Sequence, residues 1–322
     1  KRELNIALIG CGNWGKNIAR NLHQMGSLAC IYDTNSMLSK KLSHEYNLPI
    51  FEINKIFEDK NINGIVIASP AKTHKDLAIQ SLKNGKDVFI EKPFCLSLLD
   101  AQMLSELAIV RNRVLMVGHL INYHNAFIKM KQLIKNGKIG IPQNIRANRL
   151  ALGTIRSEES VIYDLSAHDI SMILSITEEL PIDVNVQSIH HHNNIGPDAV
   201  CVKLLFSRGL TALINSDWMC PYKEHKFSAI GTKGSLIFDD TKTWSEKLLY
   251  NPSFVTSNNA IESLPIEKIK IQENEPLKSE LNEFINCLHS RKSPLTDHKE
   301  GVNVQIVLDM IDKKILDNKV NL

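Results

Sequence analysis

Residues 4–15 read LNIALIGCGNWG and join an apolar strand pattern to a glycine-rich turn. Gly10, Gly12 and Gly15 have the spacing G-x-G-x-x-G, with Asn13 and Trp14 between the last two. Each glycine meets a separate need, namely a tight turn, close approach of the backbone to a pyrophosphate, and tight packing of the next helix on the strand. The positive end of that helix would face the phosphates. The stretch therefore predicts a dinucleotide-binding turn formed by these five residues.

An acidic residue, Asp33, directly follows the second predicted strand, residues 28–32. A carboxylate at this place accepts hydrogen bonds from the adenosine ribose, which favours NAD over NADP as the cofactor. Asp33 is equally placed to cap the following helix near Asn35, and the sequence leaves this alternative open.

The composition is that of an ordinary globular protein. The 322 residues suggest about two domains, and the hydrophobic content of 43% allows a substantial core. Lys and Arg outnumber Asp and Glu by only 38 to 35, so the basic field of a nucleic-acid-binding protein is missing. The six cysteines include no C-x-x-C pair, no apolar run approaches the ~18 residues of a membrane span, and the first residues lack a signal-peptide pattern. We expect a cytoplasmic protein that binds neither nucleic acid nor membrane.

Strand and helix patterns alternate along the first third of the chain. After the opening unit, strand patterns lie at residues 64–68, 87–90 and 114–117, and helical patterns lie between them at 73–83 and 97–108. Such alternation produces a parallel sheet with helices on both faces. We therefore predict an α/β fold that begins with a doubly wound Rossmann domain over residues 1–120.

From Ile141 onward the pattern changes to long strands in which polar and apolar residues alternate. The predicted strands are residues 144–152, 183–192, 199–206, 210–217, 226–231 and 235–238. Helical patterns lie at 125–135, which would link the domains, and at 164–176, 277–289 and 300–315. Residues 251–275 look like a long surface excursion. Residues 121–322 are therefore predicted to form an α+β domain with an open, mostly antiparallel sheet.

Three polar clusters carry the residue types needed for chemistry. They are Ser69-Pro70-x-x-x-His74, Glu91-Lys92-Pro93 and Asp164-x-x-x-His168-Asp169. With the glycine-rich turn and the change to an open sheet, these clusters make nearly the whole chain similar to the Gfo/Idh/MocA family of sugar and cyclitol oxidoreductases.

The resemblance implies an NAD site in the first domain and a small-molecule sugar substrate. Ser69 and His74 would lie near the cofactor, and Glu91 and Lys92 would lie near the nicotinamide ribose and the reacting carbon. The Lys92–Pro93 peptide bond would be cis, which is uncommon for X-Pro bonds in general. The resemblance also implies that residues 121–322 bind the substrate and assemble a homodimer or homotetramer.

Oxidation of a secondary alcohol removes a hydride and a proton. The site therefore needs one group that titrates near neutral pH and one cation that stabilises the developing alkoxide. His168 suits the first role and Lys92 the second. Asp164 would share a helix face with His168 and either orient its imidazole or hold a neighbouring hydroxyl. Three alternatives stay open: Lys92 in a closed pocket is itself the base, Lys92 is an exposed loop residue, or Asp164 and His168 only cap a helix.

The chain departs from the family pattern beside the expected substrate. Asn122 stands where an arginine often meets the substrate, while Arg149 and Arg156 flank the expected mouth of the site. Guanidinium groups suit a phosphate or carboxylate, although either arginine can simply solvate the edge of the sheet. The resemblance implies oxidation of a ring hydroxyl of a sugar. Similarity to family members that act on nucleotide-activated sugars, together with these two arginines, points foremost to such a sugar of polysaccharide biosynthesis. A free sugar or inositol is the alternative substrate, and a catalytically silent NAD-binding regulator is the alternative function.

The run of His190, His191 and His192 resembles a set of metal ligands. Neighbouring residues in a strand point to opposite faces, so three in a row cannot all face one ion. We therefore expect no metal site.

Overall fold

A computed structural model describes residues 4–153, 155–191, 196–256 and 258–320 of the chain. It contains two compact units. The first takes the chain up to Leu120 together with Glu275–Gln305, and the second takes Ile121–Asn274 together with the chain from Ile306 onward. The sequence assigned residues 275–305 to the second domain, whereas this segment packs on the sheet of the first.

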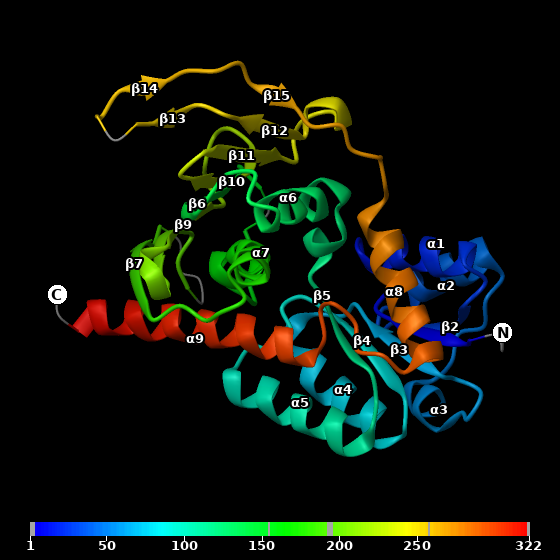
Figure 1. Cartoon of the computed structure of the whole chain (residues 1–322). Coiled ribbons are helices and arrows are strands. Elements are labelled where there is room, and N and C mark those ends of the chain that lie inside the picture. Colours follow the sequence, from blue (N-terminus) through cyan, green and yellow to red (C-terminus); the bar gives the residue numbers. More distant parts are fainter. Residues whose placement is uncertain (1–3, 154, 192–195, 257, 321–322) are drawn as a thin grey trace. The chain divides into compact units, whose positions relative to one another are not determined.

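The first unit is built on a five-stranded parallel sheet in the order β2-β1-β3-β4-β5 (Figure 1). The strands are β1 (Ile6–Ile9), β2 (Leu28–Tyr32), β3 (Gly64–Ile67), β4 (Asp87–Glu91) and β5 (Leu115–Gly118). Nearly all of their residues are buried because helices cover both faces of the sheet. The predicted doubly wound Rossmann sheet is confirmed.

Helices connect these strands and cover the sheet. They are α1 (Gly15–Gln24), α2 (Ser36–Tyr46), α3 (Ile53–Glu58), α4 (His74–Lys83) and α5 (Leu98–Arg111). A sixth helix, α8 (Pro276–Ser290), lies beside α1 in Figure 1 and is joined to it where Asn21 Nδ2 donates to Glu275 Oε1 at 2.9 Å. Phe284 of α8 packs edge-on against Phe89 of β4, with ring centroids 5.9 Å apart. This aromatic contact explains why the segment belongs to the first unit.

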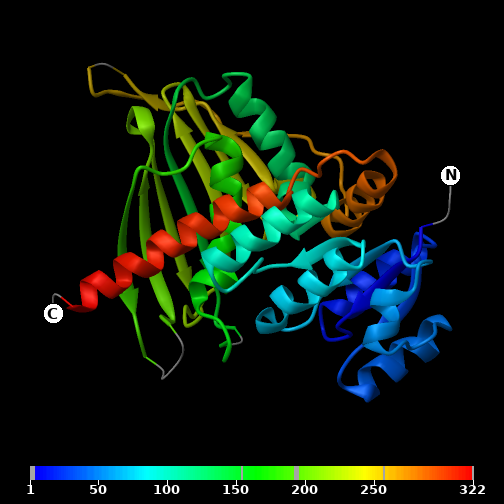
Figure 2. The ribbon, with the colours of Figure 1, turned by 90° about the horizontal axis from the view of Figure 1, so that it is seen from below.

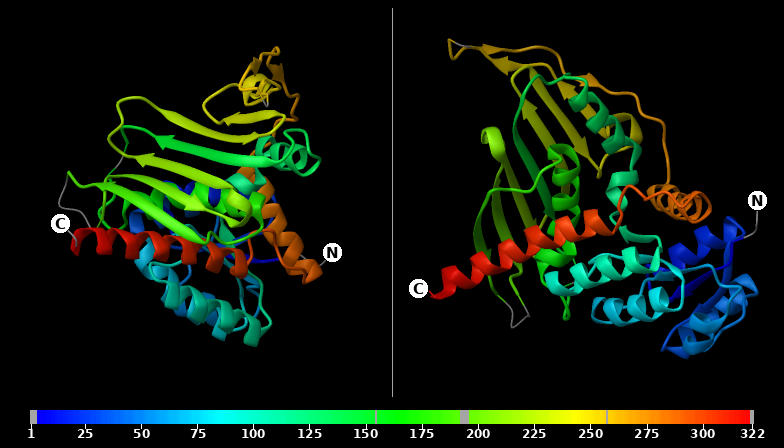
Figure 3. Two further views of the ribbon diagram at one scale, coloured as in Figure 1. Left: turned by 60° about the vertical axis from the view of Figure 1, so that its left-hand side comes forward. Right: turned by 60° about the horizontal axis from the view of Figure 1, so that its bottom comes forward.

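The second unit is built on an eight-stranded sheet in the order β15-β12-β11-β10-β6-β9-β8-β7 (Figure 3). The strands are β6 (Pro142–Leu150), β7 (Asp183–Ile189), β8 (Ala199–Leu205), β9 (Thr211–Asp217), β10 (Glu224–Gly231), β11 (Gly234–Asp239), β12 (Leu248–Asn251) and β15 (Glu267–Lys268). Only β6 and β9 pair in parallel among these described strands. The predicted open, mostly antiparallel sheet is confirmed, and the predicted surface excursion forms the hairpin of β13 (Phe254–Val255) and β14 (Ile261–Glu262).

Two helices pack on one face of this sheet. Phe127 of α6 (Asn125–Lys135) meets Phe227 of β10 with ring centroids 5.7 Å apart, so the predicted linker helix is part of the second unit. Ahead of α7 (Ala167–Thr177), the Ser166 hydroxyl donates to Ser216 of β9 at 2.8 Å. The end of α9 (His298–Val320) lies near β7, where Asn318 Nδ2 donates to the Val186 carbonyl at 3.0 Å (Figure 2).

The helix predicted over residues 164–176 begins differently from the expectation. A π-helical turn, Ile162–Ser166, precedes α7 and contains Asp164, so Asp164 does not belong to the regular α-helix that carries His168. The wider turn changes the direction of the side chains it carries, and turns of this kind recur at functional sites. The single α-helix expected over both residues is therefore corrected to a π-turn followed by α7, and the shared face of Asp164 and His168 stays a prediction.

Candidate functional site

The glycine-rich turn after β1 has room for a ligand at its centre. Gly10 has φ +101°, and a Cβ atom there would lie 2.5 Å from the backbone of Ala68. A Cβ atom on Gly15 would overlap the carbonyl oxygen of Gly10, whereas one on Gly12 would meet nothing within 4 Å. The first turn of α1, all of which is described, carries no acidic side chain. The open space at Gly12 and the helix end beside it fit a pyrophosphate.

Asp33 connects the end of β2 with this turn. Its Oδ2 accepts from the Cys11 N–H at 2.6 Å, and its Oδ1 accepts from the Asn35 N–H at 2.7 Å. Asn35 is itself the N-cap of α2, since its Oδ1 accepts from the Met37 N–H at 3.0 Å. A carboxylate has about four acceptor positions, so these two bonds leave capacity for the hydroxyls of a ribose. The geometry suits the predicted ribose contact, whereas the N-cap of α2 is Asn35 and not Asp33.

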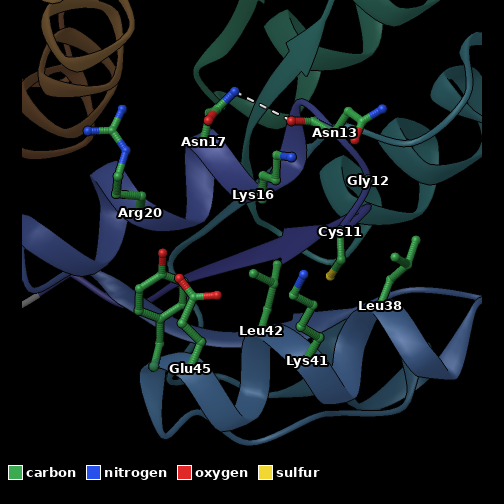
Figure 4. Close-up of a pocket in the computed structure, with 11 residues that line it drawn as sticks. Cys11, Gly12, Asn13, Lys16, Asn17, Arg20, Leu38, Lys41, Leu42 and Glu45 are labelled. Carbon is green, nitrogen blue, oxygen red and sulfur yellow. Dashed lines mark hydrogen bonds between the residues drawn. The ribbon is translucent and has the colours of Figure 1, made fainter.

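A groove of about 530 Å³ runs between α1 and α2, starting at the turn (Figure 4). Lys16 of α1 and Lys41 of α2 both line it, from opposite sides. Arg20 also lines it and pairs with Glu275, the N-cap residue of α8. The lining is completed by Cys11, Gly12, Asn13, Asn17, Leu38, Leu42, Glu45 and Tyr46. The balance of charge in this lining is positive, which favours anionic ligands near the turn.

His74 joins the loops that follow β3 and β4. Its ring nitrogens lie 2.9 Å from the carbonyl oxygen of Ser69 and 2.8 Å from that of Pro93. Burial lowers the pKa of His74, so the ring is neutral and donates to one of these carbonyls. The Ser69 hydroxyl bonds to that of Thr73 at 2.7 Å, and the Lys92–Pro93 bond is cis, as the resemblance implied. His74 thereby fixes the loop that carries Lys92.

Glu91 brings the E-K-P cluster to the glycine-rich turn. Its Oε1 accepts from the indole N–H of Trp14 at 2.6 Å, and its Oε2 accepts from the Lys92 N–H at 3.3 Å. The carboxyl also packs against Gly118, where a Cβ atom would lie 3.0 Å from Oε2. Burial raises the pKa of Glu91 to about 7, against the lowering effects of the Trp14 hydrogen bond and the Lys92 charge. Two clusters that are 77 residues apart in sequence thus form one site.

In the second unit, the Asp164 carboxylate accepts a hydrogen bond from Trp218 and forms an ion pair with Arg156. The Trp218 indole N–H donates to Asp164 Oδ2 at 3.0 Å, and Arg156 Nε lies 3.6 Å from the same oxygen. The Arg156 side chain is 49% exposed and also lies 3.9 Å from Glu159 Oε1. Asp164 is therefore held in place by a buried donor, while a cation beside it remains accessible to a ligand.

Arg149 and Asn122, expected at the substrate, bond to side chains of α7. Arg149 is buried, and its Nη2 and Nε donate to the two carboxylate oxygens of Asp169 at 2.9 and 3.2 Å. Asn122 Nδ2 donates to the Ser171 hydroxyl at 2.7 Å. Asp169 and Ser171 lie one and three residues after His168 in α7, so both contacts hold the helix that carries this histidine.

Trp218 is a site residue that the sequence analysis missed. It follows β9 directly, and its position at a strand end was the only available signal, because no motif marks it.

As for metals, the described part of the chain has no group of three or more His, Cys, Asp or Glu side chains able to hold an ion, and His192 lies outside that part. No helix among the described residues is long and apolar enough to span a membrane.

The fold and the site define a class of protein. A parallel sheet with an open glycine turn, an acidic residue after β2, and a lysine in a cis-proline loop after β4 is the arrangement of an NAD-dependent oxidoreductase. Family models agree with this class. Residues 4–119 match the model described as the oxidoreductase family with an NAD-binding Rossmann fold, and residues 127–237 match the GFO/IDH/MocA C-terminal domain. The chain belongs to the Gfo/Idh/MocA family, as the motifs predicted.

Individual relatives match nearly the full length of the chain. The scyllo-inositol 2-dehydrogenase (NAD(+)) of Bacillus subtilis is 22% identical over 95% of this chain and 92% of its own. The UDP-N-acetylglucosamine 3-dehydrogenase of Acidithiobacillus ferrooxidans is 24% identical over 94% of each chain. The solved structure of the latter enzyme superposes with a TM-score of 0.83 at 21% identity and covers 98% of both chains. This structural likeness supports the assigned fold.

Proposed function

We propose that this protein oxidises a ring hydroxyl of a sugar with NAD⁺, and that the sugar is nucleotide-activated and used in polysaccharide biosynthesis. The observation that carries the proposal is the hydrogen bond from Trp14 to Glu91, which holds the E-K-P loop beside the dinucleotide turn. This bond supports a position for the loop residue Lys92 beside the nicotinamide end of a dinucleotide that extends from the pyrophosphate turn.

Two side chains divide the chemistry in this proposal, and NAD⁺, when bound, accepts the hydride. Lys92 stabilises the negative charge that develops on the substrate oxygen, and His168 accepts the hydroxyl proton. Asp164 is a positioning residue that orients the His168 imidazole, and its own carboxylate is held by Trp218 and Arg156. Arg149 and Asn122 act on the site through α7, since both bond to its side chains. If Lys92 is itself the base, removal of His168 will leave the pH profile of the reaction unchanged.

Arg156 supports an activated substrate. Its exposed guanidinium beside Asp164 suits the diphosphate of a nucleotide sugar, because a guanidinium binds phosphate oxygens in pairs. One relative is named for oxidation of such a sugar. A free sugar or inositol is the second candidate, favoured by the relatives named for inositol oxidation. Arg156→Gln is expected to raise the KM for a nucleotide sugar and to leave the KM for a free cyclitol unchanged.

A substrate panel tests the proposal. Nucleotide sugars, free sugars and cyclitols are incubated with NAD⁺ or NADP⁺, and reduction of the nicotinamide is followed by its absorbance. Turnover of nucleotide sugars with NAD⁺ is expected. Turnover of cyclitols alone would show that the substrate is a cyclitol and not a nucleotide sugar. Cofactor binding without turnover of any compound in the panel would indicate a regulator.

Compartment and assembly complete the proposal. We place the protein in the cytoplasm because all six cysteines are free thiols, which is typical of a reducing compartment.

We further propose a homodimer or homotetramer formed through the sheet face that α6 and α7 leave open. On that face β6 presents Asn144, Arg146 and Asn148, which suit a polar interface. Light scattering after size exclusion measures the assembly, and a monomeric mass would contradict it.

A further inference from the structure

Glu280 of α8 is a buried carboxyl group that the proposed mechanism does not use. Its residue exposure is 0%, and neither carboxylate oxygen has a hydrogen-bond partner among the residues that the structure describes. An ionised carboxylate in such surroundings is strongly unfavourable, because burial removes its hydration without replacing it. The group is therefore either a defect of packing or a carboxylic acid that retains its proton.

The packing of α8 on β4 places Glu280 next to Glu91. Phe284 and Phe89 are in contact across the two elements, with ring centroids 5.9 Å apart. Glu280 precedes Phe284 by one helical turn and lies on the same face of α8, while Glu91 follows Phe89 by two residues and points to the same face of the sheet. The aromatic contact thus aligns the two carboxyls on the side where the strand ends.

Other titratable groups face this pair from three elements. Glu300 of α9 lies near Glu280, and His119, which follows β5, has its Nδ1 2.6 Å from Glu300 Oε2. Lys92 follows β4 and acts on Glu91, as His119 does. Burial and the negative charges of Glu91 and Glu300 raise the pKa of Glu280 well above its usual range. Within one dry cluster, neighbouring carboxyls do not ionise together, so one proton is retained at neutral pH.

We propose that Glu280 is the proton-holding member of a buried carboxyl pair with Glu91, and that this pair takes up one proton when the nicotinamide beside Glu91 is reduced. The inference rests on the proposed function, which places the nicotinamide at Glu91. Glu280 keeps its proton in both redox states, and Glu91 exchanges one with solvent. Glu280 is a positioning residue in this scheme. Because it stays neutral, only Glu91 changes its protonation state when the charge of the nicotinamide changes.

The charges balance in this step. The substrate C–H bond breaks, and its electron pair moves with the hydrogen to the nicotinamide ring, whose positive charge is cancelled. The hydroxyl proton leaves through His168 to solvent as the carbonyl forms. A solvent proton then adds to the Glu91 carboxylate, because the cation that favoured its ionised form has disappeared. The charge of the buried site is the same before and after the reaction.

Calorimetric titration of the whole protein with NAD⁺ and with NADH measures the coupling without turnover. Titrations at pH 7 in buffers of different ionisation enthalpy give the number of protons released on binding. Because the pKa of Glu91 is about 7, this carboxyl is about half ionised in the free protein at pH 7. NAD⁺ is therefore expected to release up to about half a proton per site, and NADH, whose neutral ring removes water from Glu91 without adding a charge, to take up as much. Equal proton numbers for the two cofactors, with both bound, would overturn the coupling and leave the proposed function standing. Failure of both to bind would overturn the proposed function and the coupling with it.

A second measurement concerns Glu280 itself. The infrared difference spectrum between the wild-type protein and Glu280→Gln at pH 8 is expected to contain the C=O band of a protonated carboxylic acid. The control is Glu283→Gln on the same helix, which keeps the oxygen that accepts from the Leu295 N–H at 2.6 Å and should give no such band. Absence of the band for Glu280→Gln would overturn the proposal.

Thermal unfolding gives an independent outcome with the same variant. The raised pKa of Glu280 in the folded state means that its contribution to stability is present at acid pH and is lost as pH rises toward that pKa. The wild-type protein should therefore lose stability relative to Glu280→Gln between pH 5 and pH 8. A variant that loses stability relative to wild type over this interval would show that Glu280 is ionised, and the proposal would fail. Should Glu280→Gln not fold, the two cofactor titrations on the wild-type protein decide the matter.

Discussion

Replacement of Arg149 by methionine separates two roles that the sequence left open. As a ligand for a phosphate or carboxylate, Arg149 would affect substrate binding and little else. In the structure its guanidinium instead makes a two-bond contact with Asp169 at 2.9 and 3.2 Å, and both side chains are buried. Arg149→Met removes both bonds and leaves the Asp169 carboxylate without its cation in a site closed to water.

The expected cost follows from that burial. Breaking a buried ion pair by removing one partner destabilises a protein by about 3–5 kcal/mol, because the remaining charge is neither paired nor hydrated. The double variant Arg149→Met/Asp169→Asn should recover much of this loss, since no unpaired charge remains. The control is Arg111→Met in the last turn of α5, whose side chain is exposed, with an expected change within about 0.5 kcal/mol.

The assay is urea unfolding followed by circular dichroism, together with the KM for the substrate. We expect Arg149→Met to lower the unfolding free energy far more than Arg111→Met does. A raised KM with unchanged stability in Arg149→Met would refute this reasoning and return Arg149 to the substrate.

The remaining predictions concern the cofactor and the chemistry. Lys92→Ala should lower kcat by a factor of about 10² or more while NAD⁺ binding persists, because its charge acts on the developing alkoxide; near-normal turnover would remove Lys92 from its role. His168→Asn should slow oxidation by about 10²–10⁴-fold, as expected for loss of a general base, and an unchanged pH–rate profile would transfer the proton to Lys92. Calorimetry should find tighter binding of NAD(H) than of NADP(H), and Asp33→Ala should reduce the difference; equal affinities in the wild-type protein would contradict the ribose contact. Gly10→Ala should abolish binding of both cofactors, because its Cβ would lie 2.5 Å from the Ala68 backbone at φ +101°, and retained binding would show that the turn is not needed.

Short sequence patterns predicted the fold well, because the spacing of apolar residues shows directly which faces of a strand or helix are buried. The buried strands of the first unit are continuous apolar runs, and those of the second alternate, so the change near Ile141 announced a change from a parallel to an antiparallel sheet. The helix over residues 277–289 was also predicted, as α8, but its partner was not. An amphipathic pattern shows that one face is buried and does not say against what, and only the contact of Phe284 with Phe89 placed α8 in the first unit.

The sequence by itself determined the chemistry that is available. Spaced glycines and a carboxylate after β2 mark a dinucleotide site, because these residues act through short-range geometry that the chain carries with it. The lysine before a proline was assigned to that site only by the family resemblance. The tertiary structure alone decided which side chains have partners. It assigned Arg149 to Asp169, Trp218 to Asp164 and Trp14 to Glu91. It also left Glu280 buried with no hydrogen bond from any residue in the described part of the chain. Pairing and burial depend on contacts between residues far apart in the chain, and the spacing of residues along a sequence does not contain that information.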